Sequence, residues 1–123
     1  MTAAPARFPG RAPIDAYGNG GFRFAGMSHR GSILCLPSGL YAWSPSEPLD
    51  ISSMQQALAE KDAVQLLILG TGAQHMEPSA QLKGAFAEAG IGLEPMNTGA
   101  ACRTYNILLG EGRAVGAALM AVP

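Results

Sequence analysis

The sequence has few charged side chains and no surplus of positive charge. Only 14% of its 123 residues are Asp, Glu, Lys or Arg, and the formal net charge is −1. A chain that binds nucleic acid or an anionic membrane needs a basic surface to contact the phosphates. The composition therefore predicts no nucleic-acid partner.

Cysteine and long apolar runs are also scarce. Cys35 and Cys102 are the only cysteines, they form no Cys-x-x-Cys pair, and two are too few for a disulfide framework. No stretch has the length of a transmembrane helix, and residues 1–13 lack the apolar run of a secretory signal. We expect a soluble, cytoplasmic protein with two reduced, buried thiols.

Apolar residues and glycines, in contrast, are abundant. Apolar residues make up 48% of the chain, which is enough for a core at this length. The sixteen glycines and nine prolines lie between intact apolar runs, so they indicate tight turns and not disorder. We expect a flexible tail over residues 1–13 and one α/β domain over residues 14–123.

The rest of the chain is organised around residues 64–72. Residues 64–69 form a short apolar run rich in branched side chains, which is typical of a strand buried on both faces. The run ends in Gly70-Thr71-Gly72, where glycine allows a sharp turn and a close approach of backbone.

The first third of the chain alternates short apolar segments with turns, which predicts an antiparallel β meander. Its expected strands are residues 14–17, 22–25, 32–36 and 40–43. Between them we expect turns at residues 18–21, at the polar segment 27–31 and at residues 37–39. This meander is expected to form an N-terminal β layer of its own.

The remainder predicts helices and strands in alternation. A helix beginning at Ser52, a helix from Pro78 to a C-cap at Gly90 and a helix over 99–109 with Thr98 as N-cap are expected. Strands are expected over 64–69, 91–94 and 113–122. A strand–helix–strand unit has parallel strands, so we expect a mixed central sheet with helices on at least one side.

Gly70-Thr71-Gly72 has two interpretations. It is either a tight exit turn or a binding loop, because ligands of α/β proteins bind at strand carboxyl ends, although neither phosphate-binding fingerprint is complete. Gln74 and His75 lie in the same loop, and imidazole titrates near neutral pH. Neither His29 nor His75 has a second ligand at metal-site spacing, and no catalytic set assembles. We expect no metal, no cofactor and no catalytic residue.

The start of the last helix supplies three further candidates. Cys102 is either a reactive thiolate near a helix N-terminus or a small buried side chain facing the sheet. Arg103 and Asn106 lie three residues apart on a more polar face, and they bind either an anionic group or partner, or loop backbone. The candidate ligand or partner site is therefore Gly70, Thr71, Gly72, Gln74, His75, Cys102, Arg103 and Asn106.

Four segments resemble the Mth-type domain family of unknown function. These segments are Leu69–Gly72, Glu94–Thr98, Ala100–Leu108 and Glu111–Val115, within a resemblance that covers residues 14–122. The sequence departs from the family pattern at Asn97, where the family usually has Asp. The resemblance implies a three-layer fold with a central mixed sheet, its last strand antiparallel to the others, and an added β layer.

The resemblance also carries a functional expectation. The family is related to an adipogenesis-associated animal protein and to a mitochondrial complex I assembly factor, which acts through protein partners. It implies a protein-interaction or complex-assembly module, with protein partners in membrane-complex assembly. The alternative is a small-molecule binder or enzyme that uses the 70–75 loop with Arg103 and Asn106, which must then converge in one pocket. A homo-oligomer is compatible with either function.

Overall fold

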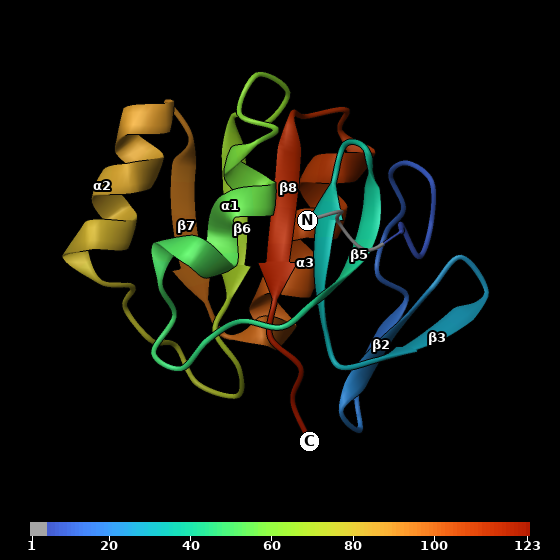
Figure 1. The fold of residues 1–123 in the computed structure, drawn as a ribbon. Coiled ribbons are helices and arrows are strands. Elements are labelled where there is room, and N and C mark those ends of the chain that lie inside the picture. The colour runs from blue at the N-terminus through green and yellow to red at the C-terminus, as the bar shows by residue number, and fades with distance from the viewer. Residues whose placement is uncertain (1–4) are drawn as a thin grey trace.

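The computed structural model describes residues 5–123, which form a five-stranded sheet, a three-stranded sheet and three α-helices (Figure 1). The elements in chain order are β1 (Ala16–Gly18), β2 (Gly21–Phe24), β3 (Met27–Arg30), β4 (Ser32–Leu36), β5 (Gly39–Trp43), the 3-10 helix η1 (Ile51–Met54), α1 (Gln55–Leu58), β6 (Leu66–Gly70), α2 (Ala80–Ala89), β7 (Gly92–Met96), α3 (Thr98–Gly110) and β8 (Val115–Leu119). The two sheets and the helices confirm the expected α/β fold with an added β layer.

The five-stranded sheet is mixed, with strand order β5-β4-β8-β6-β7. Strand β6 pairs in parallel with both β7 and β8, whereas β4 is antiparallel to β5 and β8. The expectation that the last strand is the antiparallel one is therefore wrong. The crossover through α3 returns the chain to the sheet in its original direction, and the reversed strand is β4, which a tight hairpin joins to β5.

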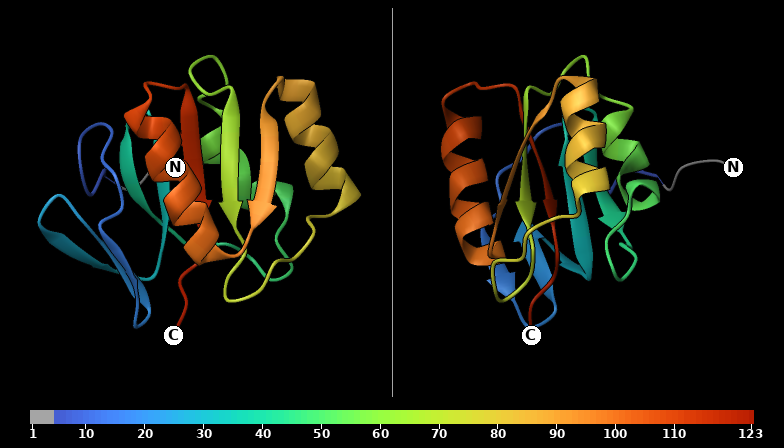
Figure 2. Two further views of the ribbon diagram at one scale, coloured as in Figure 1. Left: turned by 180° about the vertical axis from the view of Figure 1, so that it is seen from behind. Right: turned by 90° about the vertical axis from the view of Figure 1, so that its left-hand side faces the viewer.

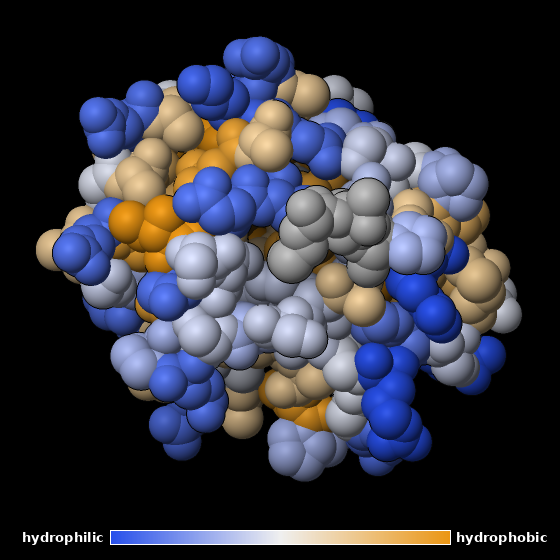
Figure 3. Space-filling view, viewed as in Figure 1, coloured by the Kyte–Doolittle hydropathy of each residue, from blue (hydrophilic) through white to orange (hydrophobic). Residues whose placement is uncertain are grey.

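Helices cover both faces of this sheet. Figure 2 shows α3 on one face and α1 and α2 on the other. Successive side chains of β6 point to opposite faces of the sheet. Ile68 packs in the core cluster beneath α3, and Leu67 and Leu69 pack in the cluster beneath α1 and α2. All three are 1% exposed, which confirms that this apolar run is a strand buried on both faces. Over α1, and between α1 and α2, hydrophobic residues also reach the surface, with hydrophilic residues around them (Figure 3).

The small sheet, in the order β1-β2-β3, packs beside α3. Its Phe22 and Phe24 share a core cluster with Tyr105 of α3. Two short turns join its strands, one at Asn19-Gly20 and one at Ala25-Gly26, and all four of these residues have positive φ. Only part of the expected meander lies in this layer, because β4 and β5 belong to the central sheet.

The prediction of a turn at the polar segment 27–31 is wrong, because residues 27–30 form β3. The sequence shows no apolar alternation here because the only buried side chain of β3 is that of His29, which is 6% exposed. Its Nε2 lies 3.0 Å from the Ser32 carbonyl oxygen. Ser28 and Arg30 point to solvent. A strand with a polar inward residue does not produce the apolar alternation by which strands are recognised.

The segment expected to be a flexible tail begins with residues 1–4, which lie outside the described residues. In the rest of it, Phe8 forms a bridge to Leu40, and its carbonyl accepts a 3.0 Å hydrogen bond from the Leu40 amide. Ala12 is 5% exposed. This segment therefore lies along the edge of β5.

Helix starts differ from the expected ones by one or two residues. The carboxylate of Asp50, and not Ser52, accepts from the Ser53 amide at the start of η1. Ser79 caps α2 by accepting from the Leu82 amide, so this helix begins at Ala80 and not at Pro78. Gly90, at φ 76°, ends α2 and confirms the expected C-cap.

Candidate functional site

The candidate loop lies where the connections of two parallel strands separate. The chain leaves β6 toward α2 on one face of the sheet, and it leaves β7 toward α3 on the other face (Figure 2). In α/β proteins, ligands bind in the crevice that forms at such a point. Gly70, Thr71 and Gly72 lie at this point.

The two glycines of the loop have different roles. A Cβ on Gly70 would lie 3.1 Å from Leu119 Cδ2 and 3.2 Å from Ala101 Cβ, so glycine lets α3 approach the sheet closely. Gly72 has space around it but adopts φ +104°, a conformation that other residues rarely adopt. The fold alone therefore explains why glycine occupies both positions, without a ligand.

Thr98, at the start of α3, links the loop after β6 to the chain that follows β8. Its hydroxyl accepts from the Gly72 amide at 3.0 Å and donates to the Met120 carbonyl at 2.7 Å, and its own amide donates to the Gly72 carbonyl at 2.8 Å. The residue is fully buried. The expectation that Thr98 is the N-cap is wrong, because Asn97 Oδ1 accepts from the Ala100 amide and is the cap.

These bonds decide what the crevice offers to a ligand. A phosphate at such a loop is held by free backbone N–H groups. Here the amides of Gly72, Thr98 and Ala100 all donate to groups of the chain itself. These three amides are therefore not free to hold an anion.

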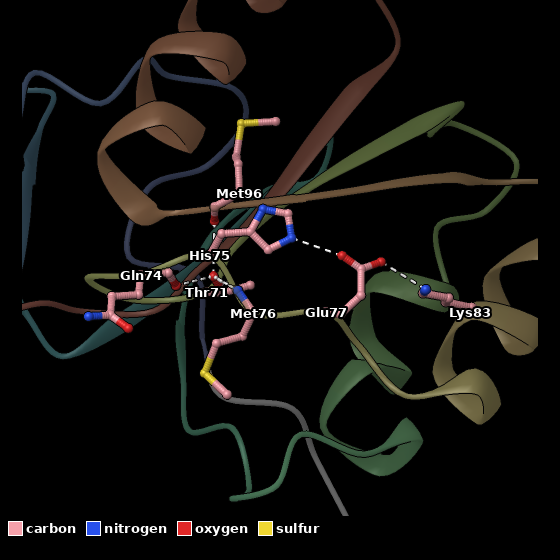
Figure 4. A network of polar contacts seen from close by, with 7 residues as sticks. All are labelled: Thr71, Gln74, His75, Met76, Glu77, Lys83 and Met96. Carbon is pink, nitrogen blue, oxygen red and sulfur yellow. Dashed lines mark hydrogen bonds and ion pairs between the residues drawn. The ribbon is translucent and has the colours of Figure 1, made fainter.

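Thr71 holds the outer part of the loop (Figure 4). Its hydroxyl lies 2.7 Å from the Gln74 carbonyl, to which it donates, and it accepts from the Met76 amide at 3.0 Å. Its backbone amide donates to the Met96 carbonyl at 2.9 Å. The loop is thus tied both to itself and to β7, while the side chains of Gln74, His75 and Met76 remain exposed.

Beyond Met76, a chain of polar contacts leads to α2 (Figure 4). His75 Nε2 and Lys83 Nζ each lie 2.8 Å from an oxygen of Glu77. Hydrogen bonding and charge from Lys83, followed by those from His75, lower the pKa of the Glu77 carboxyl. All three side chains are at least half exposed, so these contacts orient the loop more than they stabilise the fold.

Cys102 faces the core. It is 5% exposed and shares the α3-side core cluster with Cys35, which is 1% exposed. Burial raises the pKa of Cys102 to about 11, although the charge of Arg103 opposes the shift. Burial, assisted by the proximity of Cys102, also raises the pKa of Cys35. Thiols of this kind are protonated at neutral pH and are poor nucleophiles.

Asn106 binds loop backbone. Its Nδ2 donates to the Ile14 carbonyl at 2.7 Å, and its Oδ1 accepts from the Ile14 amide at 2.8 Å. The preceding Tyr105 donates from its hydroxyl to the Ala12 carbonyl at 3.0 Å. The amide of Asn106 thus joins α3 to the segment that enters β1, while Arg103 is exposed on the same helix.

The structure brings some of the candidate residues together. Gly70 and Gly72 contact Thr98 at the start of α3, and Thr71 is bonded to Met96 at the end of β7. In contrast, Cys102 lies in the core and Asn106 is bonded to Ile14. Thr71 and Gly72 also line an open hollow of about 560 Å³, whose other lining residues are Ser32, Trp43, Ser44, Pro45, Glu47, Met120 and Ala121. Gln74, His75, Arg103 and Asn106 do not line this hollow.

The sequence did not predict that the Thr98 hydroxyl joins the segments that follow β6 and β8. It also did not predict that Met76 is exposed. Met76 is 65% exposed, more than any other large apolar side chain of residues 5–123. A lone methionine in a polar loop was the available signal. In the part of the chain that the structure describes, no three His, Cys, Asp or Glu side chains gather as metal ligands, and no helix is long and apolar enough for a bilayer crossing.

Comparison with known proteins gives close relatives along nearly the whole chain. An uncharacterised protein of Rhodobacter capsulatus is 41% identical over 116 residues, which are 94% of this chain and 90% of that protein. A mouse protein named NADH dehydrogenase (ubiquinone) 1 alpha subcomplex assembly factor 3 is 31% identical over 118 residues. That match covers 94% of this chain and 64% of the mouse protein, so the chain spans less than two thirds of this relative.

Solved structures share the fold. A crystal structure from Bartonella henselae, described as an outer membrane protein, has a TM-score of 0.92 and 50% identity, covering 95% of this chain and all of that one. A solution structure from Bordetella pertussis, described as a Mth938-like domain, has a TM-score of 0.77 and 28% identity, covering 98% of this chain and 90% of that one. These matches confirm the resemblance to the Mth-type family.

A family model gives the same result on the sequence alone. The model described as "Protein of unknown function (DUF498/DUF598)" matches residues 14–120. This range includes both sheets and all the helices. The chain therefore belongs to the DUF498/DUF598 family.

Proposed function

We propose that this chain is a protein-interaction module that assists the assembly of a membrane-bound NADH dehydrogenase complex. The name of the mouse relative supports the identity of that complex. One observation carries the proposal. At the crevice where α/β proteins bind ligands, the amides of Gly72, Thr98 and Ala100 already donate to groups of the chain itself, while the loop outside it presents the exposed apolar side chain of Met76. The cytoplasmic location expected from the sequence is part of this proposal.

The contact point of the proposal is the loop 71–77. The Thr71 hydroxyl fixes the loop before any partner arrives, which lowers the entropy cost of binding. Met76 supplies an unbranched, polarizable side chain that adapts to an apolar pocket. Gln74 and His75 provide polar groups at the rim, as interfaces require. Gly70 and Gly72 shape the backbone that holds the loop, through close packing at Gly70 and a positive φ at Gly72.

A second surface supports an interaction role in general. The groove between α1 and α2 contains Leu58, Ala85 and Ala89, and Lys61 and Glu88 lie at the same groove. Apolar surface rimmed by polar residues is a feature of protein contact sites. The small-molecule alternative has less support, because the side-chain amide of Asn106, one of its required residues, is already hydrogen-bonded to the backbone of Ile14.

Affinity capture with the full, tagged chain tests the proposal. The matched variants are Met76→Gln and Ile107→Gln, because Ile107 is 60% exposed on α3, away from the loop. We expect NADH dehydrogenase subunits to be recovered from detergent-treated cells with the unaltered chain and with Ile107→Gln, and to be lost with Met76→Gln. Equal recovery with Met76→Gln would contradict the loop as contact point. Recovery of no such subunit by any version would contradict the assembly role.

A further inference from the structure

Strand β3 forms one edge of the small sheet, and no other strand within residues 5–123 pairs with its outer side. Met27 and Phe24 flank the two-residue turn and form a hydrogen-bonded pair, so the next such pair is Phe22 with His29. The backbone groups of Ser28 and Arg30 therefore point away from β2, toward the outside of β3. Outside the β2–β3 ladder, no hydrogen bond within residues 5–123 uses these backbone groups.

The outer face of this sheet is positively charged. Arg23 and Ser28 are cross-strand partners, and Arg30 lies two residues further along β3, so all three share that face. Arg23 Nη1 donates to the Ser28 hydroxyl at 3.2 Å, and neither Arg23 nor Arg30 forms an ion pair within the described chain. Figure 3 shows hydrophilic residues gathered over β2 and β3, at the lower right.

Small residues make this face hollow. Ala16, Gly18 and Gly21 lie beside the two arginines and line, together with them, a hollow of about 470 Å³. Because these three residues carry no bulky side chain, the guanidinium groups stay accessible from the solvent side. The hollow extends across β1, β2 and β3, and no residue of the 71–77 loop lines it.

The charge of the chain is divided between its two parts. Residues 1–43, which include the small sheet, carry four arginines and one aspartate, a net charge of +3. Residues 44–123 carry four basic and eight acidic residues, a net charge of −4, which together give the overall −1. Within the small sheet itself, residues 16–30, the charged side chains are Arg23 and Arg30, a net charge of +2, and this charge attracts an acidic partner.

We propose that β3 binds an extended acidic segment of a protein partner, which adds to the small sheet as a fourth strand. The segment exchanges backbone hydrogen bonds with Ser28 and Arg30. Its alternate side chains lie on the outer face, where carboxylates meet the guanidinium groups of Arg30 and Arg23. This surface is separate from the loop of the assembly proposal, and it does not depend on that proposal.

The structure favours this occupant over two others. A phosphate group would use the arginines but leave the alternating donors and acceptors of Ser28 and Arg30 without partners. A second copy of the chain, paired through the same edge, would bring two positively charged faces together. Only an acidic polypeptide matches both the edge and the charge.

The test uses the full chain, labelled with ¹⁵N, and a short peptide in which Glu and Thr alternate. We expect the amide signals of Ser28 and Arg30 to shift with added peptide, and less so at high salt. The Arg23→Gln/Arg30→Gln double variant should bind about fivefold more weakly or worse. Arg113→Gln, which removes an exposed arginine elsewhere, should bind as the unaltered chain does.

A backbone variant separates strand addition from simple charge attraction. Ser28→Pro removes an outward donor that no ladder bond uses, so the fold is retained and the peptide shifts disappear. The Gln–Thr version of the peptide should fail to bind. Equal binding of the Gln–Thr peptide, shifts confined to other amides, or no shift up to about 1 mM peptide would overturn the proposal. Concentration-dependent shifts of the same amides without peptide would also overturn it, in favour of a second copy.

Discussion

Thr98→Val is the substitution that most directly tests how the carboxyl ends of the central strands are held together. Valine has nearly the same shape, so the change removes the hydroxyl and leaves the packing in place. The structure then loses the bond from the Gly72 amide at 3.0 Å and the bond to the Met120 carbonyl at 2.7 Å. Because each bond contributes about 1 kcal/mol, we expect the free energy of unfolding to fall by about 2 kcal/mol.

Equilibrium unfolding in urea measures this loss, and a thermal midpoint about 8 °C lower should accompany it. The matched control is Thr104→Val on the same helix, where the hydroxyl forms no hydrogen bond within the described residues and the cost should stay within about 0.5 kcal/mol. If both variants lost the same stability, the role assigned to the Thr98 hydroxyl would be refuted.

Three further predictions concern other parts of the chain. Ala25 has φ 50°, so Ala25→Asn should raise the free energy of unfolding by about 0.5–1 kcal/mol in the same urea assay, and a loss would refute the strained turn. Hydrogen bonds, first from the Ser52 hydroxyl, lower the pKa of Asp50 from 3.8 to about 2. Its contribution to stability is therefore present above about pH 4 and is lost as the pH falls toward 2, and Asp50→Asn should remove this dependence in an acid titration followed by circular dichroism. Because burial raises the pKa values of Cys35 and Cys102, a thiol reagent at pH 8 should label the folded protein only as fast as it unfolds, and rapid labelling of either thiol would contradict the buried assignment.

The elements with strong local patterns were predictable from the sequence. The apolar run before Gly70 is typical of a doubly buried strand, and the stripe from Leu82 to Ala89 is typical of a helix with one buried face. Both follow from periodicity within one segment, which needs no knowledge of the partner. Gly90 was predictable for the same reason, because a helix end favours glycine locally.

Features that depend on distant partners were not predictable. The pairing of β4 with β8 joins residues that are more than 80 positions apart, so the sequence could not assign β4 and β5 to the central sheet. Thr98 has the side chain of an N-cap, but the capping residue is its neighbour Asn97. The hydroxyl of Thr98 instead serves Gly72 and Met120, which only the folded chain brings within reach.

The candidate site shows the same division. The sequence indicated the Gly70–His75 loop, because a glycine turn after a buried strand is a local signal. It did not indicate that Asn106 turns toward Ile14, since that contact spans 92 residues. Nor did it indicate Met76, whose exposure depends on how Thr71 folds the loop back on itself.

The assembly role is tested most directly by the amount of assembled NADH dehydrogenase complex in membranes of the source cell, measured on native gels after the gene is removed. The account predicts that the complex is depleted without the chain. It further predicts that the unaltered chain and Ile107→Gln restore the complex, and that Met76→Gln does not. A normal amount of the complex in cells without the chain would contradict the central claim.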